Sequence, residues 1–293
     1  MQIYIFFLYS HLKTTTVMEQ QDIMHVDVAE ILKKKAPDKA RFVPGFVTSW
    51  LARIIHQDEI NTALARFGKC ESVDFADNIV RHTLEATYTP HGIDRLDTSK
   101  RYVFVSNHPL GGLDGMVLIA CIGKRFKEVR FVVNDLLMFL KPLAPIFVPV
   151  NKFGRTGNES ARAINEAFAG DAQILYFPAG LCSRKQKDGI CDLPWKSTFL
   201  KKAKEYGRDI VPVFFNGRNS AFFYRLAKLR KALGIKFNIE MMFLPDEMFR
   251  QRGNSFELYF GEPIPISSID SSKSMNEWVE TIRNATYKLK PAK

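Results

Sequence analysis

The sequence predicts an α/β fold, with a mostly parallel central sheet flanked by helices and a helical segment before it. After Pro90, short runs rich in β-branched and aromatic residues alternate with segments of helical spacing, which is typical of β-α-β units. Before Pro90, apolar residues recur at helical spacing and strand-like runs are missing. The 293 residues are 46% hydrophobic and 25% charged, an ordinary globular composition that excludes disorder, collagen and coiled coil.

The elements follow in order along the chain. Residues 22–89 carry the N-terminal helical pattern, with apolar residues at Val28, Ile31, Leu32, Phe46, Trp50, Ile54, Phe75, Ile79 and Leu84. We expect strands over 102–105, 129–133, 146–150, 173–177, 210–214 and 256–260. We expect helices over 156–168, 195–206, 221–233 and 274–287. A boundary near residue 90 then separates a helical N-terminal region, 18–89, from an α/β domain, 90–293.

The first residues do not resemble a membrane anchor. The apolar run from Ile3 to Tyr9 is too short to cross a bilayer, and it lacks the basic start and the cleavage site of a signal peptide. Met18 opens a polar, helix-like run. We therefore expect Met18 to be the natural start and residues 1–17 to be a non-native or disordered extension.

Cysteine and histidine patterns argue against a metal centre. The four cysteines, Cys70, Cys121, Cys182 and Cys191, form no C-x-x-C pair, so we expect four free thiols in a reducing cytosol. The six histidines form neither an H-x-x-x-H nor an H-E-x-x-H arrangement. We expect no metal.

The charge of the chain is positive and unevenly distributed. The net charge is +11, and residues 196–236 hold eleven lysines and arginines against only Glu205 and Asp209, a local net charge of +9. The helix expected there has an apolar stripe and basic flanks, formed by Phe222, Leu226, Leu229 and Leu233 and by Arg225, Lys228, Arg230 and Lys231. One interpretation is a surface helix whose stripe packs on the sheet, and another is attraction to anionic lipid or an acidic carrier protein. No recognised nucleic-acid motif accompanies the charge.

The segment with the most chemical information is Ser106-Asn107-His108-Pro109-Leu110-Gly111-Gly112-Leu113-Asp114-Gly115. It follows a predicted buried strand, where α/β proteins place their sites. Two glycines between His108 and Asp114 allow the loop to fold back, so that the carboxylate orients the imidazole and the other ring nitrogen faces the cleft as a base. The alternative is an Asx-type turn with Asp114 as a helix N-cap. No G-x-S-x-G nucleophile motif occurs, which favours direct transfer to a substrate hydroxyl or amine.

This segment resembles the first motif of the lysophospholipid and glycerol-phosphate acyltransferase superfamily, which is Asn-His, four residues, then Asp. Here five residues intervene, and the wording N-H-P-L-G-G-L-D-G is similar to the hemolysin-labelled branch that includes O-acyltransferases of ornithine-type lipids. The resemblance covers about residues 90–265. It implies a glycerol-phosphate acyltransferase-like fold, with His108 and Asp114 as catalytic residues and Asn107 in substrate binding.

Later segments resemble the family's other motifs in the same order. Val148-Pro149-Val150-Asn151-Lys152 is similar to the second, and it implies that Lys152 or Arg155 holds an anionic headgroup or a carboxylate; a solvated loop is the alternative. Residues 177–184 are similar to the third, F-P-E-G-T-R-S, with Ala179 in place of the glutamate. This resemblance implies substrate contacts from Phe177, Pro178, Gly180, Ser183 and Arg184, with ordinary turn residues as the alternative. Val211-Pro212-Val213-Phe214-Phe215-Asn216-Gly217 is similar to the fourth and would line an acyl groove.

Three residues near the third motif receive weaker assignments. Cys182 lacks a nearby base in the sequence and is not expected to be a nucleophile. Asp192 and Trp195 are expected to dock the following helix, with a role in the site as the alternative.

The resemblance implies a lipid O-acyltransferase that moves a fatty acyl group from an acyl thioester to the hydroxyl of a lyso-lipid. Ala179 favours a lyso-aminolipid of the ornithine or glycine type over lysophosphatidic acid. The implied donor is acyl carrier protein or coenzyme A, without a cofactor. The expected location is the cytoplasm, peripheral on the inner face of the cell membrane, with no nucleic-acid partner. Two alternatives stay open: a 1-acylglycerol-3-phosphate acyltransferase and a non-catalytic, hemolysin-labelled lipid-binding protein.

Overall fold

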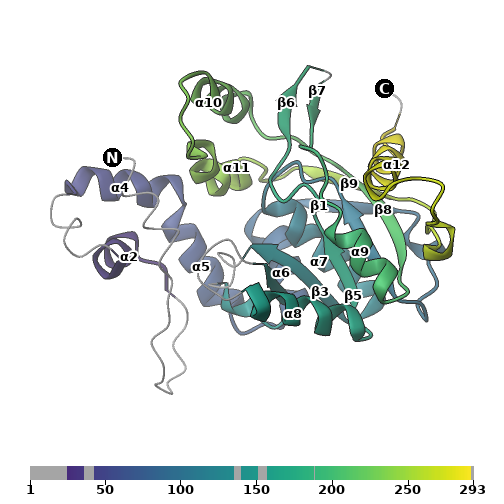
Figure 1. The fold of residues 1–293 in the computed structure, drawn as a ribbon. Helices are drawn as coiled ribbons and strands as arrows, with labels where there is room; N and C mark the ends of the chain where they lie inside the picture. The colour runs from purple at the N-terminus through teal and green to yellow at the C-terminus, as the bar shows by residue number, and fades with distance from the viewer. Residues whose placement is uncertain (1–24, 36–42, 135–139, 151–156, 188, 292–293) are drawn as a thin grey trace.

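The computed structural model describes residues 25–35, 43–134, 140–150, 157–187 and 189–291 (Figure 1). Within them, a seven-stranded sheet has the order β1-β9-β8-β2-β5-β3-β4. Neighbouring strands are parallel except β8 and β9, which pair antiparallel. The predicted α/β fold with a mostly parallel sheet is therefore confirmed.

All six predicted strands are present. They are β2 (Tyr102–Ser106), β3 (Val129–Asn134), β4 (Phe147–Val150), β5 (Gln173–Tyr176), β8 (Asp209–Asn216) and β9 (Ser255–Phe260). The predicted helices correspond to α8 (Gly157–Ala169), α9 (Thr198–Glu205), α10 (Ala221–Ala232) and α12 (Met275–Lys288). The last begins at a capping box, in which the Ser274 hydroxyl accepts from the Glu277 backbone N–H and the Glu277 carboxylate accepts from Ser274.

The expectation that no strand precedes residue 90 is wrong. Strand β1 (Thr87–His91) pairs in parallel with β9 at the sheet edge, where the missing N–H of Pro90 is tolerated. A short antiparallel hairpin, β6 (Arg184–Gln186) and β7 (Gly189–Cys191), was also not predicted. Both strand pairs consist partly of short, polar segments, and the sequence of such a segment does not indicate which strand it will pair with.

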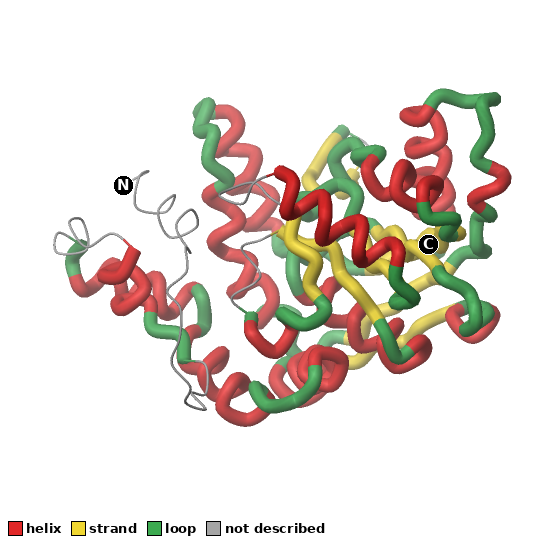
Figure 2. The backbone as a smooth tube through the Cα atoms, turned by 60° about the horizontal axis from the view of Figure 1, so that its bottom comes forward, coloured by secondary structure: helices red, strands yellow, loops and turns green. Residues whose placement is uncertain are grey.

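Helices cover both faces of the sheet (Figure 2). One face packs against α5 (Gln57–Phe67), α6 (Ser72–Asn78) and α7 (Leu113–Phe126). The other packs against α8, α9 and α12. The N-terminal helices α5 and α6 thus share a hydrophobic core with the sheet, and the division of the chain at residue 90 stays a prediction.

A second group of helices stands beside the sheet. It contains α2 (Val28–Lys35), α4 (Gly45–Ile54), the 3-10 helix η5 (Ile239–Phe243), α11 (Leu244–Phe249) and α10 (Figure 1). Helices α2 and α4 bury Val28, Leu32 and Leu51 against Met242. No helix within the described ranges is long and apolar enough to cross a membrane.

The interpretation that the apolar stripe of α10 packs on the sheet is wrong. Phe223, Tyr224 and Ala227 form the buried face of this helix, whereas Phe222, Leu229 and Leu233 are 46%, 56% and 64% exposed. The buried face packs against Cys182 and Leu244 rather than against the sheet.

Candidate active site

The first motif forms a tight loop between the end of β2 and the start of α7. Strand β2 is buried along its whole length, so its carboxyl end projects the loop from the centre of the sheet. Gly111 has a φ of 80°, which L side chains rarely adopt, and a Cβ there would lie 2.7 Å from a methyl of Leu244. Glycine is therefore required where the loop reverses.

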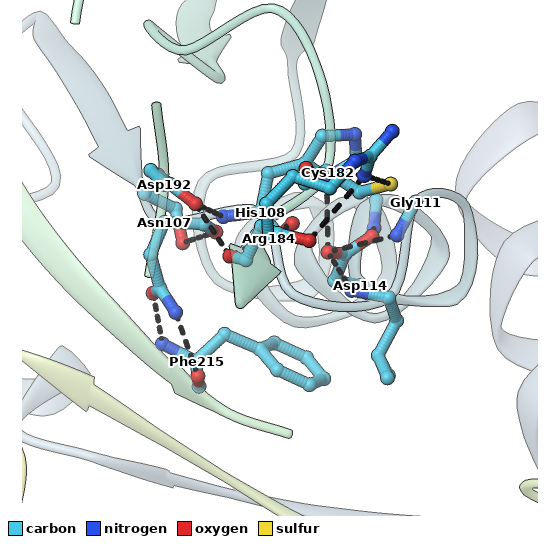
Figure 3. A network of polar contacts seen from close by, with 12 residues as sticks. Asn107, His108, Gly111, Asp114, Cys182, Arg184, Asp192 and Phe215 are labelled. Atoms are coloured by element: carbon cyan, nitrogen blue, oxygen red, sulfur yellow. Dashed lines mark hydrogen bonds and ion pairs between the residues drawn. The ribbon is translucent and has the colours of Figure 1, made fainter. Parts of the chain in front are cut away.

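The reversal brings His108 and Asp114 together, as the sequence predicts (Figure 3). The His108 Nδ1 lies 2.9 Å from Oδ2 of Asp114. The same oxygen accepts the backbone N–H of Leu110 at 2.9 Å and of Gly111 at 3.4 Å, while Oδ1 accepts from Gly115 at 3.0 Å. Asp114 is 0% exposed, and its position is fixed by backbone donors on both oxygens.

These bonds set the tautomer of the imidazole. Because the carboxylate accepts backbone hydrogens at the same oxygen, Nδ1 of His108 donates and its Nε2 keeps the lone pair. No hydrogen bond within the described part of the chain engages Nε2. The interpretation of Asp114 as an N-cap is wrong, because the N-cap of α7 is Gly112 and Asp114 is the second helical residue.

Phe177 of the third motif holds the imidazole ring from one face. The two ring centroids are 3.9 Å apart with an interplanar angle of 18°. Phe131 meets Phe177 edge-on at 5.3 Å, so the stack is itself supported by the core. This packing restricts rotation of His108 about its side-chain bonds.

Ser183 binds the backbone of the same histidine. The Ser183 backbone N–H donates to the His108 carbonyl at 2.7 Å, and Ser183 is buried. Pro178 and Gly180 form the turn that leads to it: the Gly180 N–H donates to the Phe177 carbonyl at 3.0 Å, and the Pro178 carbonyl accepts from the Lys196 N–H at 3.0 Å. The structure thus places the third motif against the first.

Asn107 joins two strands of the sheet. Its Oδ1 accepts the Phe215 N–H at 2.7 Å, and its Nδ2 donates to the Phe215 carbonyl at 3.0 Å. The side chain is buried, and both ends of its amide are engaged by β8. The structure therefore places Asn107 between β2 and β8, where it joins the two strands. The resemblance had instead implied a contact with the substrate.

Arg184 is held inside the protein. It donates to the Cys182 carbonyl at 2.7 Å and to Glu240 at 3.0 Å, and its guanidinium lies 5.1 Å from the centre of the Phe223 ring. Glu240 is fully buried and also accepts from Arg230 of α10 at 2.9 Å. This ion-pair network connects the third motif to α10. The other predicted cationic contacts, Lys152 and Arg155, lie outside the described residues.

Two further residues of the third motif are buried. Burial raises the pKa of Cys182 to about 11, so its thiol is protonated at neutral pH. Ala179, which stands at the position of the glutamate in F-P-E-G-T-R-S, is buried in the core cluster of the α9 face. Within the described ranges, no group of three or more His, Cys, Asp or Glu side chains has the arrangement of a metal site.

The sequence did not indicate one contact of the first motif. Asp192, which follows β7, accepts the His108 backbone N–H at 3.2 Å (Figure 3). It also accepts the Trp195 indole N–H at 2.9 Å. Trp195 packs on Phe199 of α9, as expected for a docking residue. Asp192 and His108 are 84 positions apart, and no local pattern could have revealed this contact.

A buried carboxylate that orients a histidine at a strand end forms a general base, which an acyl-transfer reaction can use. The model of the acyltransferase family matches residues 30–293, and the chain belongs to this family. The predicted superfamily is confirmed, and the protein is an enzyme that transfers acyl groups.

Two curated relatives cover nearly the whole chain. A lyso-glycine lipid O-acyltransferase of Bacteroides thetaiotaomicron is 45% identical over 93% of this chain and 100% of its own length. One of Phocaeicola vulgatus with the same name is 44% identical over 94% of this chain and 99% of its own. Among solved structures, the 1-acyl-sn-glycerophosphate acyltransferase PlsC of Thermotoga maritima matches with a TM-score of 0.47 and 14% identity, over 83% of this chain and 96% of its own.

Proposed function

We propose that this acyltransferase transfers a fatty acyl group from a thioester to the hydroxyl of a lyso-glycine lipid. The observation that carries the proposal is the His108–Asp114 pair, in a chain with two lyso-glycine lipid O-acyltransferases among its relatives. The acceptor would be an N-acylated glycine whose acyl chain bears the hydroxyl. The product would be the corresponding O-acylated, two-chain lipid.

His108 is the general base in this proposal. Its Nε2 removes the proton of the acceptor hydroxyl while the oxygen attacks the thioester carbonyl, so a C–O bond forms and the C–S bond then breaks. The imidazolium returns the proton to the departing thiolate. Asp114 keeps Nδ1 protonated and stabilises the imidazolium. General-base catalysis of this kind contributes roughly 10²–10⁴-fold to the rate.

The remaining predicted site residues have separate roles in this proposal. Phe177 and Ser183 position the histidine, because one stacks on its ring and the other binds its carbonyl. Lys152 and Arg155 stay predicted ligands of the acceptor carboxylate. Arg184 acts through its bonds to Cys182 and Glu240 and fixes the shape of the third motif.

A panel of acceptors tests the assignment. Purified enzyme receives acyl carrier protein thioester or acyl-coenzyme A, with N-(3-hydroxyacyl)glycine, the matching ornithine compound and lysophosphatidic acid in competition. Mass spectrometry of the lipids is expected to show O-acylated glycine lipid as the main product. Phosphatidic acid as the main product would move the enzyme to phospholipid synthesis, and no product from either donor would contradict the proposed acceptors. The preferred thioester identifies the donor.

We also propose that the protein docks peripherally on an anionic membrane surface through α4 and α10. Trp50 of α4 and Phe222 of α10 both contact Phe243, at ring-centroid distances of 6.3 and 5.1 Å. These contacts place the exposed rings on one face of the helical group. Phe46, 75% exposed, and Leu229 extend its apolar surface.

Basic side chains accompany this apolar surface. Arg225, Lys228 and Lys231 of α10 are exposed, and each lysine or arginine near an anionic surface contributes about 1 kcal/mol. The Arg230–Glu240–Arg184 network places the same helix beside the third motif. A lipid acceptor would therefore meet the enzyme close to its catalytic loop. The inner face of the cell membrane is the surface that we propose.

Charge reversal tests the docking face. Changing Arg225, Lys228 and Lys231 to Glu is expected to weaken binding to phosphatidylglycerol vesicles at least tenfold at low salt. The matched control changes Lys201, Lys204 and Lys288 to Glu, which alters the net charge equally on exposed positions of α9 and α12. Equal loss of vesicle binding in both triple variants would show that only the net charge matters and would contradict the proposal.

A further inference from the structure

A second buried carboxylate lies behind the catalytic histidine. Asp192 follows the β6–β7 hairpin and is 0% exposed. Its side chain points toward the loop of His108 (Figure 3). Its other carboxylate oxygen bonds to the Trp195 indole. Burying a carboxylate costs free energy unless hydrogen bonds satisfy it. We therefore expect Asp192 to be held by hydrogen-bond donors and to have a function.

Three donors converge on the Asp192 carboxylate. Oδ1 accepts the His108 backbone N–H at 3.2 Å and the Ser183 hydroxyl at 2.6 Å, and Oδ2 accepts the Trp195 indole N–H at 2.9 Å. Ser183 in turn donates its N–H to the His108 carbonyl. The backbone of His108 is therefore held at its N–H by Asp192 and at its carbonyl by Ser183.

No ion pair within the described ranges includes the Asp192 carboxylate, and Arg283 donates to the Asp192 backbone carbonyl at 3.4 Å rather than to the side chain. Among the described residues, His108 and Tyr287 interact electrostatically with Asp192, and Arg283 and Cys191 in turn interact with Tyr287. Burial raises the pKa of Asp192, whereas the bonds from Ser183, Trp195 and His108 oppose that rise.

We propose that Asp192 is a positioning residue of the reaction, which fixes the His108 backbone and supplies a second buried negative charge that favours the imidazolium. Asp114 acts on Nδ1 of the ring, and Asp192 acts through the peptide group of the same residue. The inference rests on the proposed role of His108 as the base. In a low-dielectric interior, a charge without a counterion acts over several ångströms, so both carboxylates contribute when the imidazole takes up the hydroxyl proton.

The pH profile of kcat/KM distinguishes this role from a purely structural one. Asp192→Asn removes the charge but keeps the size of the side chain, so His108 binds a proton less readily. The acidic limb of the profile should move to lower pH by roughly half to one pH unit, and the plateau should fall about tenfold. Trp195→Phe is the matched control, because it removes one donor to the carboxylate and leaves the aspartate in place. Its acidic limb should stay at the wild-type pH.

An Asp192→Asn profile with a lower plateau but an unmoved acidic limb would overturn the electrostatic part of the proposal. If that variant does not fold, ¹³C-carboxylate NMR of the wild-type enzyme decides, with Trp195→Phe used to assign the Asp192 signal. The proposal requires an ionised Asp192 throughout the active pH range, and a protonated one would overturn it. His108→Ala shows whether the proposed base or the role of Asp192 is at fault. If His108→Ala retains activity, the proposed base is wrong. If His108→Ala is inactive and the acidic limb of Asp192→Asn is unmoved, only the role of Asp192 is contradicted.

Discussion

Asp114→Asn is the substitution that most sharply probes how the carboxylate orients the base. The amide has two orientations in the site. With its oxygen in the place of Oδ2, it still accepts from His108 and from the backbone N–H of Leu110 and Gly111, and only the Gly115 N–H loses its acceptor. Turned over, it keeps the Gly115 bond, donates to Nδ1 and leaves the Leu110 and Gly111 N–H groups unsatisfied.

The first orientation keeps one more hydrogen bond than the second. At about 0.5–1.5 kcal/mol for each neutral hydrogen bond, it should predominate, and His108 keeps its active tautomer. What is lost is the charge that stabilises the imidazolium. A hydrogen bond to a charged group contributes about 1.5–3 kcal/mol, so the expected loss in kcat/KM is roughly 10- to 150-fold.

The loss in kcat/KM is measured by the release of thiol from acyl-coenzyme A, or by the loss of acyl carrier thioester. The assay is run at saturating and at limiting concentrations of the acceptor. Thermal unfolding of the same sample shows whether the variant is folded. Wild-type activity in Asp114→Asn would refute the role of the carboxylate. A loss as large as that of His108→Ala would refute the hydrogen-bond argument, because it would mean that the amide had turned over.

Two further predictions concern neighbouring residues. Asn107→Ala leaves the buried N–H and carbonyl of Phe215 without partners, which costs about 1–3 kcal/mol for each group. The midpoint of thermal unfolding should therefore fall by several degrees. An unchanged midpoint would show that the amide does not hold β2 to β8. Cys182→Ser should retain acyl transfer, because burial raises the pKa of the Cys182 thiol to about 11 and a thiolate nucleophile is not available at neutral pH. Detection of an acyl group on Cys182 by mass spectrometry would contradict direct transfer.

Local patterns in the sequence were sufficient for most of the fold. The six strands that were predicted are short apolar runs between turn residues, and the final helix carries its own start signal at Ser274. Strand β1 was missed because its sequence, Thr87–His91, is short and contains a proline, and because its partner β9 begins at Ser255. Parallel pairing over such a separation leaves no trace in the periodicity of either segment.

The candidate site was predictable where its residues are close in the chain. Two glycines between His108 and Asp114 indicated the fold-back, and the structure has the two side chains in contact. Helix docking was the expected role of Asp192, with a role in the site as the alternative, and its bond to His108 could not be predicted because it arises from the tertiary fold. The buried face of α10 was misjudged for the same reason: the periodicity defines an apolar stripe, but the packing partner decides which residues it covers.

The measurement that most directly tests the account is the formation of O-acylated glycine lipid by the wild-type enzyme and by folded His108→Ala, with the same acyl thioester and N-(3-hydroxyacyl)glycine. Mass spectrometry of the lipids and assay of the released thiol follow both products of one reaction. Direct transfer with His108 as the base predicts equal amounts of two-chain lipid and thiol from the wild-type protein, and a loss of roughly 10²–10⁴-fold in the variant. Undiminished product from His108→Ala would contradict it.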